Sequence, residues 1–357
     1  MTLARLLLAV EGYTPRVEDL YRDTLEVASA VGGLPHQVPI LRSLASFHLQ
    51  IGHMNEVASI GHDILAIADG EGDDGMRIEG LVILGAPTAF MGDIPGGIAQ
   101  FDRAIGLFDP DRHGGGALRV GPNPVVVAHS VGALFLWMTG YPDTAQRRAA
   151  ASIALAERLG HPYSLAYAIF HAAMLDLWNG RMDTAGEHAR RVVQIATESE
   201  YPVWRASGLI VEGVTVAALG RPEEGLELTD RGIGLYETLR TPPIFWPQVL
   251  GLRAQALAHA GRVSEALDAV TEAMRVAGPD DTFDLIALLL GQADLQLASG
   301  DPAAAEASLQ DGLAKARSIG ARTPELVAAL RLSQLDGESE ERRAAIRAVY
   351  DTLTEGF

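Results

Sequence analysis

A ladder of glycines about forty residues apart runs through the chain, and it constrains the fold more than any other feature. Successive members are separated by 40, 40, 48, 40, 40, 41 and 39 residues. Self-similarity at a fixed period of this size is typical of helical solenoids, in which each repeat is one supersecondary unit. The ladder therefore predicts an all-α solenoid of stacked helical hairpins. Its members are Gly12, Gly52, Gly92, Gly140, Gly180, Gly220, Gly261 and Gly300.

The residues that follow each glycine have the chemistry of a hairpin turn, as in Gly140-Tyr141-Pro142-Asp143-Thr144-Ala145. A helix commonly ends with a residue in the left-handed conformation, which glycine adopts without a Cβ penalty. Proline or an acidic residue then suits the first turn of the next helix. A small or slim residue lies five positions after each of the last seven glycines, where we expect the second helix to press on the first. These residues are Val57, Gly97, Ala145, Ala185, Gly225, Ala266 and Ala305.

The composition does not shift along the 357 residues, so we expect one solenoid over 1–357. Segments between the glycines have an apolar period of 3.6, and proline-containing links separate the units. We expect a degenerate first unit over 1–33, repeats over 34–336 and a C-terminal helix over 337–357. One repeat is eight residues longer than the others, and the excess lies in an irregular loop over 109–124. Insertions in solenoids map to loops and often carry function.

The residues that common catalytic and cofactor sites need are missing or wrongly placed. The chain has no cysteine, and its single lysine, Lys315, follows Ala314 rather than the glycine of a P-loop. The string Gly70-Glu71-Gly72-Asp73-Asp74-Gly75 fits G-x-G-x-x-G, but it follows a helical pattern and carries three carboxylates where a pyrophosphate would lie. No HExxH metal motif occurs. We therefore expect no cofactor, no metal and no catalytic activity.

The charge balance and hydropathy limit the partners. The 46 acidic residues outnumber the 28 basic ones, which gives a formal net charge of −18. An acidic surface repels phosphate backbones, so we expect no direct binding of nucleic acid. No apolar run reaches the roughly 20 residues that span a bilayer. The absence of cysteine fits a reducing compartment, and we expect a cytoplasmic protein.

Candidate binding residues fall in three groups, each with a structural alternative. His113, Arg119 and Asn123 lie in the irregular loop, which is either positioned for binding or a solvent loop, as Gly114-Gly115-Gly116 favours. Tyr163, Tyr167 and His171 are spaced four apart on one helical face; they contact a ligand, or His171 is a hydrogen-bonded structural histidine.

The third group lies on first helices, which line the concave surface of a hairpin solenoid. Polar residues there are candidates for ligand contact, and the alternative is interhelical salt bridging. The group comprises Trp204, Arg205, Glu212, Trp246 and Arg253.

Several of these stretches together resemble a known family. They are His113 with Gly121-x-Asn123-Pro124, the stretch Leu136-Trp137-x-x-Gly140-Tyr141-Pro142-Asp143-x-Ala145, His161-Pro162-Tyr163-Ser164, and Thr354-Glu355-Gly356-Phe357. The chain resembles the C-terminal tetratricopeptide-like region of bacterial multidomain regulators. In that family the region follows a nucleotide cyclase domain or a LuxR-type DNA-binding module, and then an AAA-type, STAND-like predicted ATPase.

The resemblance implies a right-handed solenoid of tetratricopeptide-like hairpins and a regulatory role beside an attached ATPase or cyclase. Two features depart from the family. Gly121-Pro122-Asn123-Pro124-Val125 replaces its Gly-x-Asp-Pro-Gly, and the sequence stops at Phe357, where the family continues with a further helix. The chain is therefore expected to be a cut fragment or the product of a trimmed gene.

Two functions follow from these observations. The first is a non-catalytic binding, scaffold or sensor module that takes a peptide, a protein segment or a small inducer on its concave face. The second is an enzyme on a helical-repeat scaffold, with Tyr163, His171 or Arg205 in a central pocket. The missing catalytic groupings favour the first. We expect any special site to lie around the irregular unit, between residues 109 and 171.

Overall fold

The computed structural model describes residues 8, 12–31, 34–113, 121–239, 245–278, 281–335 and 340–356. Every regular element in these residues is helical, which confirms the all-α prediction. The first helices of the units are α3 (Val38–Gln50), α5 (Asp74–Phe90), α8 (Pro124–Met138), α10 (Pro162–Trp178), α12 (Pro202–Ala218), α14 (Trp246–His259), α16 (Thr282–Ala298) and α18 (Arg322–Leu335). The second helices are α2 (Pro15–Val31), α4 (Met54–Glu71), α6 (Ile94–Leu107), α9 (Pro142–Leu159), α11 (Met182–Glu198), α13 (Pro222–Thr238), α15 (Val263–Ala277) and α17 (Pro302–Ser318).

Three further elements stand outside the hairpins. They are a 3-10 turn η1 (Leu34–Gln37), the short helix α7 (Pro110–His113) and the last helix α19 (Glu340–Tyr350). None of the described helices has both the length and the apolar character needed to cross a bilayer.

The glycine ladder forms the hairpin turns, as predicted. All eight glycines have positive φ, between 70° and 104°. In the seven turns from Gly52 onward, the residue after the glycine donates its N–H to the carbonyl five residues earlier; Tyr141 donates to Leu136 at 2.9 Å and Arg181 to Asp176 at 2.9 Å. This bond satisfies a carbonyl that would otherwise be orphaned at the helix end. The turns are therefore fixed by local backbone chemistry.

The small position after each turn is buried in every unit, which confirms that the second helix presses on the first there. At two of these positions even a methyl group would not fit. A Cβ on Gly97 would lie 2.5 Å from the carbonyl oxygen of Gly85, and one on Gly225 would lie 2.5 Å from that of Gly213. Backbones that approach this closely leave room only for glycine at these two positions.

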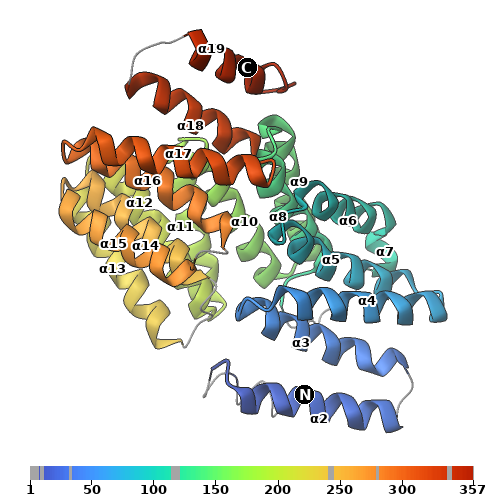
Figure 1. Ribbon diagram of the computed structural model, residues 1–357. Coiled ribbons are helices and arrows are strands. Elements are labelled where there is room, and N and C mark those ends of the chain that lie inside the picture. The colour runs from blue at the N-terminus through green and yellow to red at the C-terminus, as the bar shows by residue number, and fades with distance from the viewer. Residues whose placement is uncertain are drawn as a thin grey trace.

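The first helices lie on the inner side of the curve. Each packs on the first helix of the next unit, from α3 through α18, whereas no second helix packs comparably on the next second helix in the described part of the chain. Figure 1 shows the result: the units from α3 to α7 form one arm, those from α11 to α17 form another, and α8 to α10 join them. A concave surface lined by first helices agrees with the tetratricopeptide-like expectation.

The late units return to the middle of the chain, where α17 and α18 lie beside α8 and α9 in Figure 1. Phe283 on α16 packs against Phe90 and Phe135, with ring centroids 5.0 and 5.4 Å away. The Thr323 hydroxyl on α18 donates to the carbonyl of Trp137 at 2.6 Å. The solenoid is therefore closed by contacts between units that are far apart in sequence.

Two expected segments differ in detail. Part of the irregular loop is helical, as α7, and residues 114–120, with the predicted site residue Arg119, lie outside the described residues. The last helix does not fill 337–357, because α19 ends at Tyr350 and residues 351–356 continue as turn and irregular chain. These residues leave the helix to reach α9, where Gly356 adopts a φ of 91° and donates its N–H to Asp143.

Candidate functional site

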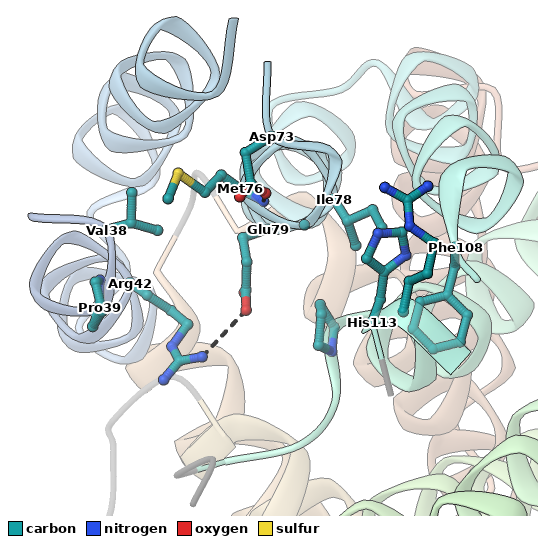
Figure 2. A pocket seen from close by; sticks show the side chains of 12 residues that line it. Val38, Pro39, Arg42, Asp73, Met76, Ile78, Glu79, Phe108 and His113 are labelled. Atoms are coloured by element: carbon teal, nitrogen blue, oxygen red, sulfur yellow. Dashed lines mark hydrogen bonds and ion pairs between the residues drawn. The ribbon is translucent and has the colours of Figure 1, made fainter. Parts of the chain in front are cut away.

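A cavity of about 420 Å³ opens on the inner face between α3, α5 and α7 (Figure 2). Its volume lies within the roughly 300–1,000 Å³ typical of ligand pockets. Its walls come from two successive first helices, from the short inserted helix and from the start of α8. The lining residues are Val38, Pro39, Arg42, Asp73, Gly75, Met76, Ile78, Glu79, Phe108, Arg112, His113 and Pro124.

An ion pair crosses this pocket. Figure 2 shows Arg42 on α3 and Glu79 on α5 pointing toward one another, and Nη1 of Arg42 lies 3.2 Å from Oε1 of Glu79. The Glu79 side chain is 11% exposed and that of Arg42 is 26% exposed. A carboxylate that is buried to this extent needs a charged or hydrogen-bonding partner. The pair therefore places fixed, partly desolvated charges in a cleft that also has apolar walls from Val38, Met76 and Phe108.

The insertion brings His113 to the pocket. The extra residues fold as α7, whose start is fixed by the Asp109 carboxylate, which accepts the N–H of Asp111 at 2.9 Å. Nδ1 of His113 accepts the N–H of Asp109 at 3.0 Å. The neutral ring must then carry its proton on Nε2. His113 thus offers one fixed hydrogen-bond donor at the pocket.

Asn123, also predicted as a contact residue, caps a helix. Its Oδ1 accepts the N–H groups of Val125 at 2.9 Å and Val126 at 3.4 Å, and the residue is 4% exposed. Its own N–H donates to the Ser164 hydroxyl at 2.8 Å, and that hydroxyl lies 2.7 Å from Nδ1 of His161. The irregular unit and the His161-Pro162-Tyr163-Ser164 stretch are therefore joined at the starts of α8 and α10.

The second predicted group forms an aromatic cluster around Trp204. The indole ring lies 5.7 Å from Tyr163, 5.4 Å from Tyr167 and 5.6 Å from Phe170, between ring centroids. Burial raises the pKa of Tyr163, and the nearby indole N–H of Trp204 opposes that rise. Burial also raises the pKa of Tyr167. The rings pack against one another, in the edge-to-face and tilted arrangements that aromatic pairs favour.

His171 is held inside this cluster. Its Nδ1–H donates to the Tyr167 carbonyl at 2.8 Å, and its ring stacks on Tyr167 at 4.1 Å. Burial lowers the pKa of His171 to about 4, although the bond to the carbonyl opposes the shift. The imidazole is therefore neutral at pH 7. This is the arrangement expected of a structural histidine.

The remaining candidates do not converge on one place. Trp246 stacks on Tyr236 at 6.1 Å, and Nε of Arg253 lies 3.0 Å from Oδ1 of Asp230 in an interhelical salt bridge. Arg205 is exposed. Glu212 is half-buried, which raises its pKa, while the charges of Arg190 and Arg231 lower it. In the described residues no group of three or more histidine or acidic side chains forms a metal site.

Sequence reasoning missed most of the pocket. Arg42, Met76, Glu79 and Phe108 carry no motif, and only the single carboxylate of Glu79 within the apolar stretch Ile78 to Leu84 gave a signal. Asp73 lies in the G-x-G-x-x-G string, and it caps α5 by accepting the N–H of Met76 at 2.9 Å. The string therefore spans the end of α4, the turn at Gly72 and the start of α5, in agreement with its rejection as a dinucleotide motif.

No protein-family model and no curated protein matches the sequence. Among solved structures, the Rap conjugation gene regulator of the plasmid pLS20 in complex with the Phr* peptide matches with a TM-score of 0.58 and 11% identity, over 87% of this chain and 81% of its own. Cut9 of the APC/C Cut9–Hcn1 hetero-tetramer matches with a TM-score of 0.57 and 14% identity, over 90% of this chain and 52% of its own.

A STAND protein with a tetratricopeptide repeat sensor from Pyrococcus horikoshii matches with a TM-score of 0.50 and 12% identity, over 97% of this chain and 50% of its own. The chain thus spans about half the length of the Cut9 and Pyrococcus horikoshii chains. Likeness at these identities shows the tetratricopeptide-like fold.

Proposed function

We propose that this chain is a non-catalytic binding module, the sensor or scaffold part of a signalling or transcription regulator, and that it takes a peptide, a protein segment or a small inducer in the pocket between α3, α5 and α7. One observation carries the proposal. The repeat that is eight residues longer than the usual forty supplies α7 and His113, and these lie at a ligand-sized cavity on the inner face. An insertion whose described part lines a cavity supports a binding role for this unit.

The lining suggests what would bind. Val38, Met76 and Phe108 offer apolar walls for one aliphatic or aromatic side chain. The Arg42–Glu79 pair and the donor on His113 are placed to orient polar backbone groups beside it. A few fixed polar groups in an apolar cleft are typical of sites that hold a short segment in one orientation. The structure of the Rap conjugation gene regulator with the Phr* peptide shows that a solenoid of this general fold can hold a peptide.

The wider assignment rests on the resemblance stated above. We infer a bacterial, cytoplasmic regulator in which this solenoid controls an attached ATPase or cyclase, without contacting nucleic acid itself. The net charge of −18 supports the last point, since it opposes association with a phosphate backbone.

Ligand retrieval tests the proposal. The chain is purified from its native cytoplasm, co-eluting peptides and small molecules are identified by mass spectrometry, and their affinity is measured by calorimetry. Arg42→Ala and His113→Ala are each expected to weaken binding roughly tenfold or more, as loss of a central polar contact does. Arg331→Ala is the matched control, because it removes a first-helix arginine whose ion pair with Asp294 lies outside the pocket. Equal affinity of the two pocket variants and the wild type would show that the ligand does not bind in this pocket.

A further inference from the structure

The chain beyond α19 folds back on the turn between α8 and α9. Glu355 lies there with both carboxylate oxygens engaged: Oε1 accepts the N–H of Thr144 and Oε2 accepts the Thr144 hydroxyl, each at 2.9 Å. Nη2 of Arg147 lies 3.6 Å from the same carboxylate, which is 17% exposed. The N–H of Gly356 donates to Oδ2 of Asp143 at 3.1 Å. Four contacts therefore join segments more than 200 residues apart.

The first turn of α9 needs such a partner. The first N–H groups of a helix have no intrahelical acceptor, and Pro142 at the helix start removes only one of them. Tyr141 at the N-cap supplies no side-chain hydrogen bond. Glu355 supplies the acceptor instead, and its charge lies at the positive end of the helix dipole. The carboxylate therefore does from a distance what an N-cap side chain does locally.

Two glycines make the fit. A Cβ on Gly140 would lie 2.5 Å from Cδ2 of Leu353, and a Cβ on Gly356 would lie 2.6 Å from Cγ of Pro142. Both have positive φ, at 94° and 91°. The turn and the segment are in contact without space for a side chain on either glycine, so Leu353 and Gly356 bracket Glu355 in one position.

We propose that the α8–α9 turn is a binding site for a short acidic segment, and that residues 353–356 occupy it as a clasp that holds the solenoid closed. The matched chemistry is an apolar residue over Gly140, a carboxylate two positions later on the first turn of α9, and a glycine against Pro142. Thr323 and Phe283 hold the same two parts of the solenoid together nearby. The clasp adds an attachment in which three of the four polar contacts engage the Glu355 carboxylate, so it can be released without unfolding either unit.

A cysteine pair tests the docked position in the full chain, which has no cysteine of its own. A Cβ on residue 356 lies 3.9 Å from Cβ of Pro142, within the roughly 3.5–4.5 Å that a disulfide spans. Pro142→Cys with Gly356→Cys is expected to form an intramolecular disulfide under mild oxidation. Pro222→Cys with Gly356→Cys is the control, because Pro222 starts α13 as Pro142 starts α9. No cross-link in the first pair, or a cross-link only between two chains, would overturn the clasp.

Amide exchange tests the carboxylate. Glu355→Ala is expected to speed exchange of the Thr144 amide by roughly ten- to a hundredfold, the range for losing a hydrogen bond to a charged group. Asp351→Ala removes an exposed carboxylate from the same segment, and is expected to leave that rate unchanged. Unchanged exchange in Glu355→Ala, or an equal acceleration in both variants, would show that Glu355 does not hold the turn.

Discussion

The turns after α8 and after α10 share the sequence Gly-x-x-Asp-Thr-Ala, yet their surroundings differ. Space around Gly180 is open, since no described atom lies within 4 Å of where its Cβ would be, and Thr184 is exposed. Gly140 lies against Leu353, and Thr144 is hydrogen-bonded to Glu355. The same six-residue pattern forms the same hairpin in both places. What it does beyond that is decided by residues from another part of the chain.

The α10–α11 turn is held mainly from within. Asp176, which is 2% exposed, accepts from Nε of Arg181 at 3.0 Å and lies 2.9 Å from Nδ1 of His188. The corresponding position on α8 is Leu136, which offers no such group. One turn therefore depends on a buried carboxylate of its own unit, and the other depends on a carboxylate at residue 355.

The largest predicted effect follows from removing the buried carboxylate that holds the α10–α11 turn. Asp176→Ala should lower the free energy of unfolding by about 2–3 kcal/mol, somewhat less than for a fully buried ion pair because Arg181 is 44% exposed and regains water. Asp183→Ala, an exposed acidic residue of the same turn, should change it by less than about 0.5 kcal/mol. Urea unfolding followed by circular dichroism measures both. Equal midpoints would mean that the Asp176 contacts add nothing to stability.

The second prediction compares the two turn glycines. Gly180→Ala should cost about 1–2 kcal/mol, the penalty of placing a Cβ residue in the left-handed region. Gly140→Ala should cost roughly 1–3 kcal/mol more, because its methyl group meets Leu353 and must displace the clasp. The difference in urea midpoint between the two variants measures the extra contact. If both variants lose the same stability, Leu353 moves aside without cost, and the proposed close packing of Leu353 on Gly140 is wrong.

The glycine ladder, the hairpin turns and the small residues behind them could be predicted because they depend on residues close in sequence. The closure could not be predicted in this way. Residues 140–145 and 180–185 differ at only two positions, and nothing local distinguishes a turn that receives Glu355 from one that faces solvent. The pocket shows the same limit: the sequence singles out His113 because it lies in the insertion, whereas Arg42 and Glu79 meet between two helices and carry no local pattern.

A third prediction concerns acidity, and uses one partly buried histidine from each of the two units. Burial lowers the pKa of His129 on α8 to about 4, with a further lowering by Arg148, and burial lowers that of His171 on α10 to about 4. A histidine whose pKa is depressed in the folded state contributes full stability above its unfolded pKa, near 6.5. That stability is lost as the pH falls toward 4, because the unfolded chain takes up the proton first.

Each histidine should therefore cost about 2 kcal/mol of stability between pH 7 and pH 5. Urea unfolding at the two pH values, repeated for His129→Gln and His171→Gln, assigns the loss to each unit. We expect each variant to remove about half of the slope that the two histidines produce. A slope that neither variant reduces would assign the acid sensitivity to other groups.

The smallest predicted effect comes from removing the Thr144 hydroxyl, which binds Glu355 of the clasp. Thr144→Val keeps the backbone N–H that donates to Glu355 but removes the hydroxyl that donates to Oε2 and accepts from Arg147. Loss of the hydroxyl should lower the free energy of unfolding by about 1–1.5 kcal/mol, because its acceptor is a charged and largely buried carboxylate. Thr184→Val makes the identical change at an exposed position and should fall within about 0.5 kcal/mol of zero. In the background of Glu355→Ala, the loss of stability caused by Thr144→Val should fall to that caused by Thr184→Val, since the Thr144 hydroxyl then has no distant partner. A Thr144→Val effect that persists there belongs to the helix itself and not to the clasp.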